Sequence, residues 1–256
     1  MFVYEINQSK GWKNQFYILF IHVDDIFSNN IDMLNKEKLL IGERFKVQDL
    51  GEVNYVLGMV VKRDRKSRKL TISQPKYLEG ILKRFQMENC KPVSTPMEAG
   101  KQFCALSEDE KPINVQEYQK MIGCLTYVST ATRPDLANAV GILARYMSRP
   151  RMEHFKGVKR VLRYIKGTIN HGLVFKANEE KQMIIGYSDA DWGNDLDTRR
   201  SISGYVFQVK GSTVSWCSKR QTCIARSSTE AEYVVLSLAT QEIVWLKKLL
   251  QDVNVR

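Results

Sequence analysis

The sequence has 256 residues, of which 43% are hydrophobic and 10% aromatic, a composition that excludes a disordered or fibrous protein. Its formal net charge of +11 favours a polyanionic partner such as nucleic acid. The five cysteines include no C-x-x-C pair, which argues against a disulfide framework or a zinc ribbon and suits a reducing compartment.

No stretch of the sequence is typical of a membrane protein. The start, MFVYEINQSKGWKN, lacks the apolar core of a signal peptide. The longest apolar stretch, FYILFIHV, is far shorter than the roughly 20 residues that a membrane-spanning helix needs. We therefore expect an intracellular, soluble protein without a membrane partner.

Strands and helices alternate in the first third of the chain. Residues 16–28 predict a strand, a turn at two aspartates and a returning strand. Helical spacing follows over 32–45, and residues 55–73 predict a two-stranded ribbon with a charged tip. Pro75 opens a further helix that is expected to end near Cys90.

The middle of the chain predicts a linker followed by helices. Residues 93–115 are rich in proline and poor in apolar residues, so they are the best linker candidate. Helical periodicity covers 116–147 with a break at Thr132–Pro134. It resumes after Pro150 and is expected to end at Gly167.

From Gly172 onward the apolar period changes to two. The stretches GLVFK, MIIGYSD, SGYVFQV and STVSWCS read as strands joined by glycine and polar turns. SSTEAEYVVLSLATQEIVWLKKLL then predicts a long terminal helix. Strands followed by a helix indicate a small α/β domain here, and the chain as a whole is expected to be α+β.

Positive charge gathers in two stretches. KRDRKSRK at 62–69 holds six basic residues and one acid, and the helix after Pro150 carries cations around one apolar stripe. Either stretch could be an ordinary solvated surface, but two together favour phosphate contacts. The candidate nucleic-acid-binding residues are Lys62, Arg63, Arg65, Lys66, Lys159, Arg160, Arg163 and Lys166.

The adjacent carboxylates Asp24 and Asp25 interrupt an apolar strand. A hairpin tip explains them, because Asp is a common turn residue. The alternative is a magnesium site, since burying either carboxylate is costly without a cation and Mg²⁺ favours one or two carboxylates with water and phosphate.

A second candidate pair is Asp189 with Glu232. Asp189 ends a predicted strand, and Asp191 follows on the same face. With Thr229 as N-cap, Glu232 would complete a capping box. Glu232 also stands at the head of the expected buried face of the terminal helix, so its carboxylate would lie near Asp189 at the end of the strand. A divalent-metal site is therefore the competing interpretation. The residues expected on that buried face are Val235, Leu236, Ala239, Ile243, Leu246 and Leu250.

Taken in order, several stretches resemble the reverse transcriptase and ribonuclease H region of Pol polyproteins from Ty1/copia-type retrotransposons. HVDDI resembles the Y-V-D-D motif of the palm. The ordered matches after it are FKVQDLGEVNYVLGM, CKPVSTPM, GCLTYVSTATRPDLANAV, KRVLRYIKGT, YSDADWGNDLDTRRSISGYVF and SSTEAEYVVLS. Together they cover nearly the whole chain.

The resemblance implies an organisation and a chemistry. It implies a palm remnant and start of the thumb over 1–92, the linker over 93–115, a helical thumb or connection over 116–170, and a truncated ribonuclease H-like domain over 171–256. Asp24 and Asp25 would stand at the polymerase Mg²⁺ positions, and Asp189 and Glu232 would be ribonuclease H carboxylates. The implied partners are an RNA–DNA hybrid or primer–template duplex and the remainder of the Pol polyprotein.

The sequence also departs from the family pattern. His22 replaces the tyrosine before V-D-D. The resembling palm needs a further metal-binding aspartate upstream, but residues 1–23 contain no Asp. The family's third ribonuclease H aspartate lies on a strand after the long helix, where this sequence offers only Asp252. Both carboxylate sets are therefore incomplete, and the chain is expected to be inactive alone. The alternative function is a decayed or repurposed non-catalytic remnant that keeps a basic nucleic-acid-binding surface.

Overall fold

The computed structural model describes residues 2–4, 17–22, 25–28, 31–46, 48–105, 113–177 and 183–252. Two compact units are present: one is Asn54–Ile243, and the other combines Met1–Val53 with Val244–Arg256. All described strand pairs are antiparallel, and this mixture of helices and antiparallel sheets agrees with the predicted α+β class. None of the described helices is long and apolar enough to cross a membrane.

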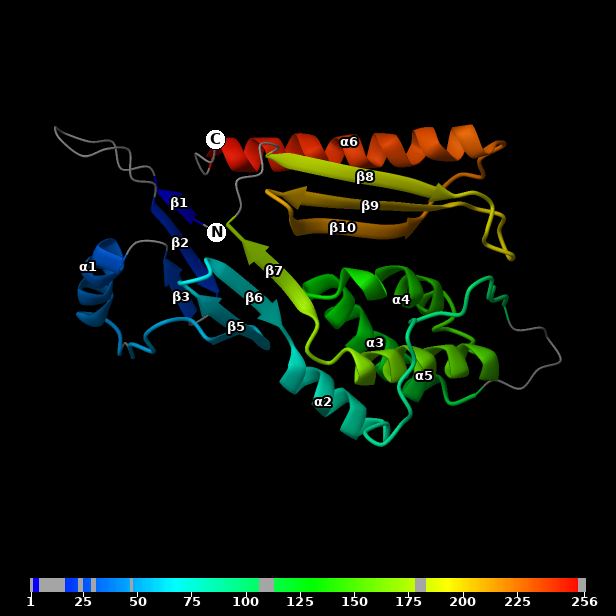
Figure 1. The fold of residues 1–256 in the computed structure, drawn as a ribbon, viewed down its shortest axis with the longest axis horizontal. Helices are drawn as coiled ribbons and strands as arrows, with labels where there is room; N and C mark the ends of the chain where they lie inside the picture. Colours follow the sequence, from blue (N-terminus) through cyan, green and yellow to red (C-terminus); the bar gives the residue numbers. More distant parts are fainter. Residues whose placement is uncertain are drawn as a thin grey trace. The chain divides into compact units, whose positions relative to one another are not determined.

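The N-terminal residues form a three-stranded sheet with one helix. Strands β1 (Phe2–Tyr4), β2 (Tyr17–His22) and β3 (Asp25–Ser28) are ordered β1-β2-β3. His22 and Asp25 are the last partners of the β2–β3 hairpin, so the predicted strand–turn–strand over 16–28 is confirmed for the described backbone. Helix α1 (Ile31–Gly42) follows (Figure 1).

A four-stranded sheet begins the larger unit. Its order is β4-β5-β6-β7, and its strands are β4 (Tyr55–Val56), β5 (Met59–Asp64), β6 (Lys69–Ser73) and β7 (Gly172–Lys176). The sequence pattern groups β7 with the strands that follow it, but β7 pairs with β6, and Ser73 lies opposite Gly172. At this pairing a Cβ on Gly172 would lie 2.3 Å from the Ile72 carbonyl oxygen, so glycine permits the close approach.

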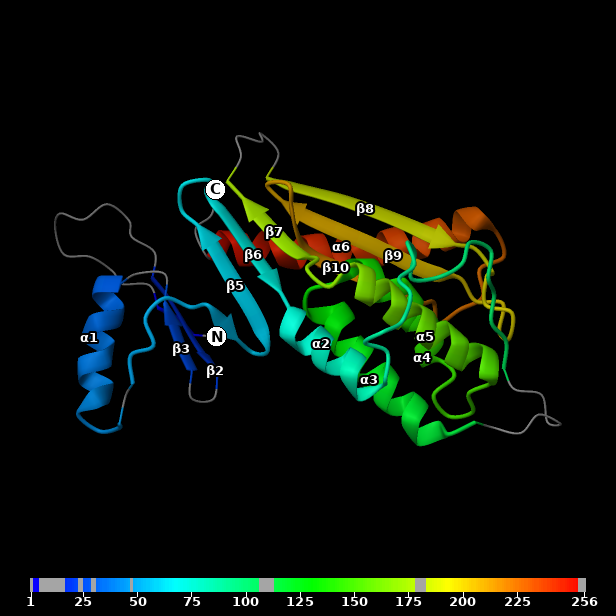
Figure 2. The ribbon, with the colours of Figure 1, turned by 60° about the horizontal axis from the view of Figure 1, so that its bottom comes forward.

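Helices fill the chain between β6 and β7 (Figure 2). They are α2 (Pro75–Arg84), α3 (Val115–Ala131), the 3₁₀ turn η1 (Pro134–Leu136), α4 (Ala137–Ala144) and α5 (Met152–Gly167). Their apolar faces form the main core, in which Leu125, Val128, Val158 and Leu162 are fully buried.

Helix α2 ends at Arg84, before the expected end near Cys90. The backbone reverses at Gln86, whose φ of 56° lies in the left-handed region. The Met87 amide donates to the Leu82 carbonyl at 2.8 Å and the Gln86 amide to the Lys83 carbonyl at 3.1 Å. This is the hydrogen-bond pattern of a Schellman motif, which stops a helix by satisfying its last carbonyls.

The C-terminal part forms a second antiparallel sheet in the larger unit. Strands β8 (Ile184–Asp191), β9 (Ile202–Val209) and β10 (Ser212–Arg220) are ordered β10-β9-β8, and helix α6 (Ser228–Asp252) follows them. The Ser215 hydroxyl donates to Glu242 of α6 at 2.6 Å. The Trp216 indole, on the next residue, donates to the Ser129 carbonyl of α3 at 2.8 Å. The sheet therefore contacts α6 on one face and the helical core on the other.

Candidate nucleic-acid interface and carboxylate sites

The first predicted carboxylate pair is only partly within the described chain. Asp24 lies outside the described residues, and Asp25 is described as the first residue of β3, by its backbone alone. Asp25 is the Cα partner of His22, which stands where the resembling motif has tyrosine. The roles of Asp24 and Asp25 stay predictions.

Glu232 does reach the strand that carries Asp189. Its Oε1 accepts a hydrogen bond from the Ala190 amide at 3.3 Å, which links α6 to β8. Asp189 and Asp191 alternate with Ala190 along β8, and both are exposed. The structure thus brings Glu232 to the backbone next to Asp189, while the Glu232 carboxylate already accepts from a backbone N–H.

The start of α6 differs from the prediction that Thr229 is the N-cap. The Ser227 hydroxyl accepts from the Glu230 amide at 3.1 Å, and Glu230 accepts from the Arg226 amide at 2.7 Å. Capping is therefore carried out by Ser227 and Glu230. Because the helix begins at Ser228, Glu232 is not needed for the cap.

The buried face of α6 is also shifted from the predicted one. Ala231, Val235, Ala239 and Leu246 are buried, whereas Leu236 is 52% exposed. Glu232 is exposed as well, and it lies one turn before Leu236. The prediction that Leu236 lies on the buried face, with Glu232 at its head, is wrong because the face follows Ala231, a small residue that the apolar stripe does not include.

Asp189 and Asp191 line a cavity of about 320 Å³ on the face of β8–β10 opposite α6. Tyr187 and Trp216 also line this cavity, and Glu232 is not among its lining residues. Among the described residues, no three side chains of Asp, Glu, His or Cys come together as a group that could hold a metal ion. The metal-binding roles of Asp189 and Glu232 therefore stay predictions.

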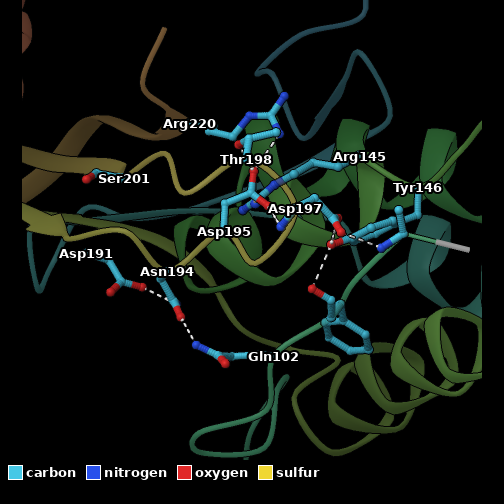
Figure 3. Close-up of polar contacts among 12 residues, drawn as sticks. Gln102, Arg145, Tyr146, Asp191, Asn194, Asp195, Asp197, Thr198, Ser201 and Arg220 are labelled. Atoms are coloured by element: carbon cyan, nitrogen blue, oxygen red, sulfur yellow. Dashed lines mark hydrogen bonds and ion pairs between the residues drawn. The ribbon is translucent and has the colours of Figure 1, made fainter. Parts of the chain in front are cut away.

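The loop over 192–201, which connects β8 and β9, contains the buried carboxylate of Asp195 (Figure 3). Asp195 accepts from the Arg220 guanidinium at 2.6 Å and from the Thr198 hydroxyl at 2.7 Å, and Arg145 at the end of α4 lies 3.4 Å away. Burial opposes ionisation of Asp195, but these donors and positive charges outweigh it and lower the pKa of Asp195. The loop is therefore fixed to both β10 and α4.

The same loop holds the chain over 102–105. Gln102 donates to Asn194, which in turn donates to Asp191 at the end of β8 (Figure 3). Asp197 accepts from the Ala105 amide at 2.8 Å. Asp191 is thus tied to neighbouring side chains, which gives it a structural role beside any role in the cavity.

The predicted cations of 62–69 form an exposed hairpin tip between β5 and β6. Asp64 holds the turn: it accepts from the Lys66 amide at 2.9 Å, and its other oxygen accepts from the Ser67 hydroxyl at 2.7 Å. The bond from Ser67 lowers the pKa of Asp64, so the carboxylate stays ionised. Lys62 and Arg63, which precede Asp64 on β5, are both exposed.

The predicted cations of α5 are arranged differently. Arg160 donates to Glu98 at 2.9 Å and to Thr95 at 3.0 Å, and Arg163 donates to the Lys91 carbonyl at 2.7 Å. These bonds hold the segment Lys91–Phe103, which we call the strap, against α5. Two of the four cations predicted to bind phosphate on this helix therefore have partners within the chain.

Lys159 and Lys166 are the other predicted cations of α5. The Lys159 ammonium lies 5.0 Å from the centre of the Phe155 ring, and Lys166 lies in the last turn, where a cation is favourable for the helix dipole. Neither contact consumes the positive charge as an ion pair would. The nucleic-acid contacts of all four residues stay predictions.

A buried arginine forms an ion pair at the break between α3 and η1, where the sequence pattern does not predict one. The Arg133 side chain is 1% exposed and donates to Asp135 at 2.7 Å and to the Thr168 hydroxyl at 2.7 Å. The Tyr164 hydroxyl also donates to Asp135, at 2.9 Å. The sequence shows a helix break at T-R-P, but nothing local indicates that Arg133 joins this break to the end of α5.

The chain is similar to proteins encoded by transposons. Residues 7–99 match a family model described as a reverse transcriptase (RNA-dependent DNA polymerase). Over 249 residues, 94% of this chain, the sequence is 40% identical to the retrovirus-related Pol polyprotein from transposon TNT 1-94 of Nicotiana tabacum. It is 37% identical, over 246 residues and 95% of this chain, to the corresponding polyprotein from transposon RE1 of Arabidopsis thaliana.

Coverage differs sharply between relatives. The chain spans 19% of the tobacco polyprotein and 16% of the RE1 polyprotein. By contrast, it is 38% identical to an uncharacterized mitochondrial protein of Arabidopsis thaliana over 229 residues, which are 89% of this chain and 93% of that protein. No solved structure matches the chain.

Proposed function

This chain belongs to the reverse transcriptase family of copia-type Pol polyproteins, and from that premise we propose that it acts on nucleic acid as part of such a polyprotein. Its substrates would be a primer–template duplex and an RNA–DNA hybrid. The process would be RNA-directed DNA synthesis with cleavage of the hybrid. The observation that carries this proposal is the identity of 40% along 94% of the chain.

The surface chemistry supports a nucleic-acid partner. Lys62, Arg63 and Lys66 are exposed on one hairpin, and Asp64, the one acid of the stretch 62–69, is used in the turn. Exposed cations without a neutralising acid bind phosphates and release counterions, largely irrespective of sequence. The hairpin would therefore position a duplex without selecting its bases.

The proposal includes the two-metal chemistry of the family only as the residues that would bind the metal ions. When bound, Mg²⁺ ions stabilise the attacking and leaving oxygens of phosphoryl transfer. Asp24, Asp25, Asp189 and Glu232 are the residues proposed to contribute to such sites. Because Glu232 is bonded to the Ala190 amide and no three-ligand group forms among the described residues, no catalytic step is assigned to this chain alone.

Fluorescence anisotropy with a labelled RNA–DNA hybrid tests the binding part. The logarithm of the association constant should fall linearly with the logarithm of the salt concentration. Replacing both Lys62 and Lys66 by alanine should make that slope shallower by about 1 for each phosphate that is no longer neutralised. Lys120→Ala, an exposed lysine of α3, is the matched control and should leave the slope close to that of the unaltered chain. A slope unchanged in the double variant would contradict the hairpin assignment.

A hybrid-cleavage assay tests the catalytic part. The isolated chain is expected to show no Mg²⁺-dependent cleavage above background, since its described carboxylates do not form a complete site. Cleavage that depends on Mg²⁺ and is abolished by Asp189→Asn would overturn this expectation. That result would also exclude the alternative that the chain is a non-catalytic binding remnant.

A further inference from the structure

A cavity of about 650 Å³ in the larger unit is lined by five cationic residues. It lies where the β5–β6 hairpin and β7 meet the ends of β9 and β10. We call it the cationic cradle, and its charged and aromatic lining residues are Arg63, Arg65, Arg68, Lys69, Lys176 and Phe175. Arg68, Lys69, Phe175 and Lys176 are not among the binding residues that the sequence predicts.

Two of these cations are placed directly against each other. Lys69 on β6 and Lys176 on β7 are cross-strand partners, and both are exposed. Like charges directly opposite each other in an antiparallel pair are destabilising. The fold therefore keeps a repulsive pair in a position where an oppositely charged or neutral residue would pair more favourably.

The one acid of the cradle lies on the other side of Lys69, because Asp64 on β5 is the cross-strand partner of Lys69, and the charge of Lys69 contributes to lowering the pKa of Asp64. Among the described residues that line the cavity, only Asp64 is acidic, and its two oxygens accept from the Lys66 and Ser67 amides and the Ser67 hydroxyl. Within the described part of the chain, no ion pair involves Arg63, Arg68, Lys69 or Lys176. Five cations and one carboxylate line the cavity, so the lining of the cradle carries a net positive charge.

The cradle also has an apolar part. Phe175 is half-buried, and Leu70, Val209 and Val214 line the cavity with it. A positive groove combined with an aromatic side chain is the composition that binds unpaired nucleotides, because the cations hold the phosphates and the ring stacks on a base. A paired base in a duplex is already stacked and does not offer its face in this way.

We propose that the cationic cradle binds a single-stranded segment of nucleic acid, with its phosphodiester groups on Lys69, Lys176 and the hairpin arginines and one base on Phe175. The inference rests on the proposed function and specifies that the nucleic acid is single-stranded at this site. It adds a single-strand contact to the duplex contacts proposed for the exposed hairpin.

The first test is Lys176→Glu, which replaces the repulsive pair by an attractive one. Thermal unfolding should occur at the same or a higher temperature than in the unaltered chain, because the repulsion from Lys69 is removed. Binding of a labelled oligothymidylate should nevertheless weaken by at least about tenfold, with a shallower salt slope, because a cation that holds a phosphate is replaced by an anion. Stability and affinity should thus change in opposite directions, which a general folding defect would not produce.

Lys120→Glu is the matched control, since it makes the same charge change on α3, away from the cradle. It should reduce oligothymidylate binding far less than Lys176→Glu. Equal losses in the two variants would mean that only net charge matters, and the cradle would be rejected. A loss of duplex binding as large as the loss of single-strand binding would reject the single-strand assignment.

The second test is Phe175→Leu, which keeps an apolar side chain and removes the ring. Oligothymidylate affinity should fall by about fivefold or more, as for loss of one stacked base. An abasic oligomer with the same number of phosphates should bind both proteins equally. Equal affinity of both proteins for oligothymidylate would overturn the stacking contact.

If the unaltered chain bound hybrid duplex while neither cradle variant changed oligothymidylate binding, only the cradle would fail. If the unaltered chain bound no nucleic acid at all, the proposed function would fail with it.

Discussion

His154 lies in the core beside two aromatic rings. It is fully buried, it stacks on Tyr146 with ring centres 3.9 Å apart, and the Phe103 ring is 5.5 Å away. Its Nδ1 accepts from the Arg151 amide at 2.8 Å at the start of α5. Burial disfavours the charged imidazolium and lowers the pKa of His154 below its ordinary value of 6.5.

This environment predicts a loss of stability in acid. Because its pKa is lowered in the folded state, His154 contributes stability that is present above pH 6.5 and is lost as the pH falls toward the folded-state pKa. The midpoint of thermal unfolding should therefore drop between pH 7 and about pH 5.5, and the drop should be smaller in His154→Gln. The glutamine oxygen can still accept from the Arg151 amide.

His171→Gln is the control for this experiment, because His171 is exposed. It should show the same acid-dependent drop as the unaltered chain. An equal drop in His154→Gln would mean that other groups cause the acid sensitivity, and the assignment to His154 would be wrong.

For single residues, sequence patterns identify the type of interaction, such as helix capping, more reliably than the residues that make it. S-x-x-E at 227–230 and T-x-x-E at 229–232 are both capping patterns, and they overlap at the start of α6. The tertiary packing of Ala231 and Val235 fixes where the helix begins, which no local pattern contains. Arg133 is a similar case, because its partner Thr168 lies 35 residues along the chain.

Helix α5 shows how one element combines packing and attachment. Its predicted apolar stripe is confirmed at Val158, Val161, Leu162 and Ile165, all fully buried. Its cationic side is predicted to contact phosphate or to be a solvated surface, and in the structure Arg160 and Arg163 of that side hold the strap. The strap reads as a linker because it has few apolar residues, and the few that it has, such as Phe103, are buried in the core.

Two helical glycines give opposite predictions for the same substitution. A Cβ added to Gly80 of α2 would have nothing within 4 Å, so Gly80→Ala should stabilise the protein by about 0.5–1 kcal/mol through helix propensity. A Cβ on Gly157 of α5 would lie 2.9 Å from Leu143 Cδ2 and 3.0 Å from Phe103 Cζ. Gly157→Ala should therefore be destabilising by about 1 kcal/mol, because overpacking exceeds the propensity gain.

Chemical denaturation of the two variants measures both changes. Because each variant adds one methyl group to a helix, the pair controls for composition. Gly157→Ala that stabilised as much as Gly80→Ala would show that Phe103 and Leu143 move aside without cost, and that the strap is packed more loosely than the structure indicates.

On the scale of the whole molecule, most of the side chains that are described as buried lie in the larger unit. Val128 of α3 and Val161 of α5 are fully buried, whereas Leu39 of α1 in the other unit is 74% exposed. Local stability follows the extent of apolar burial. Amide hydrogen exchange should therefore be slowest in α3 and α5 and faster in α1, as measured by mass spectrometry of peptides from each helix. Exchange in α5 as fast as in α1 would contradict a folded core.

The fold class follows from the sequence, since period-two strands and apolar helical stripes are local signals. The grouping of the strands does not, because β7 joins β6, which is distant in the chain, rather than its neighbour β8. The two carboxylate sites depend on such long-range assembly. The sequence singles out Asp189 and Glu232, but only the folded chain shows that Glu232 bonds to Ala190 while Asp189 lines a cavity.

The pairing of Ser73 with Gly172 has a consequence for how the chain could be rearranged. Everything from Gln74 to His171 leaves the sheet at one strand and returns at its immediate neighbour, so it is an insertion with adjoining ends. Such a module can be moved between host sequences, because its two ends lie next to each other on neighbouring strands and can replace the turn between them. A host β-hairpin carrying these residues in place of its turn would acquire the buried helical core as one transferable piece.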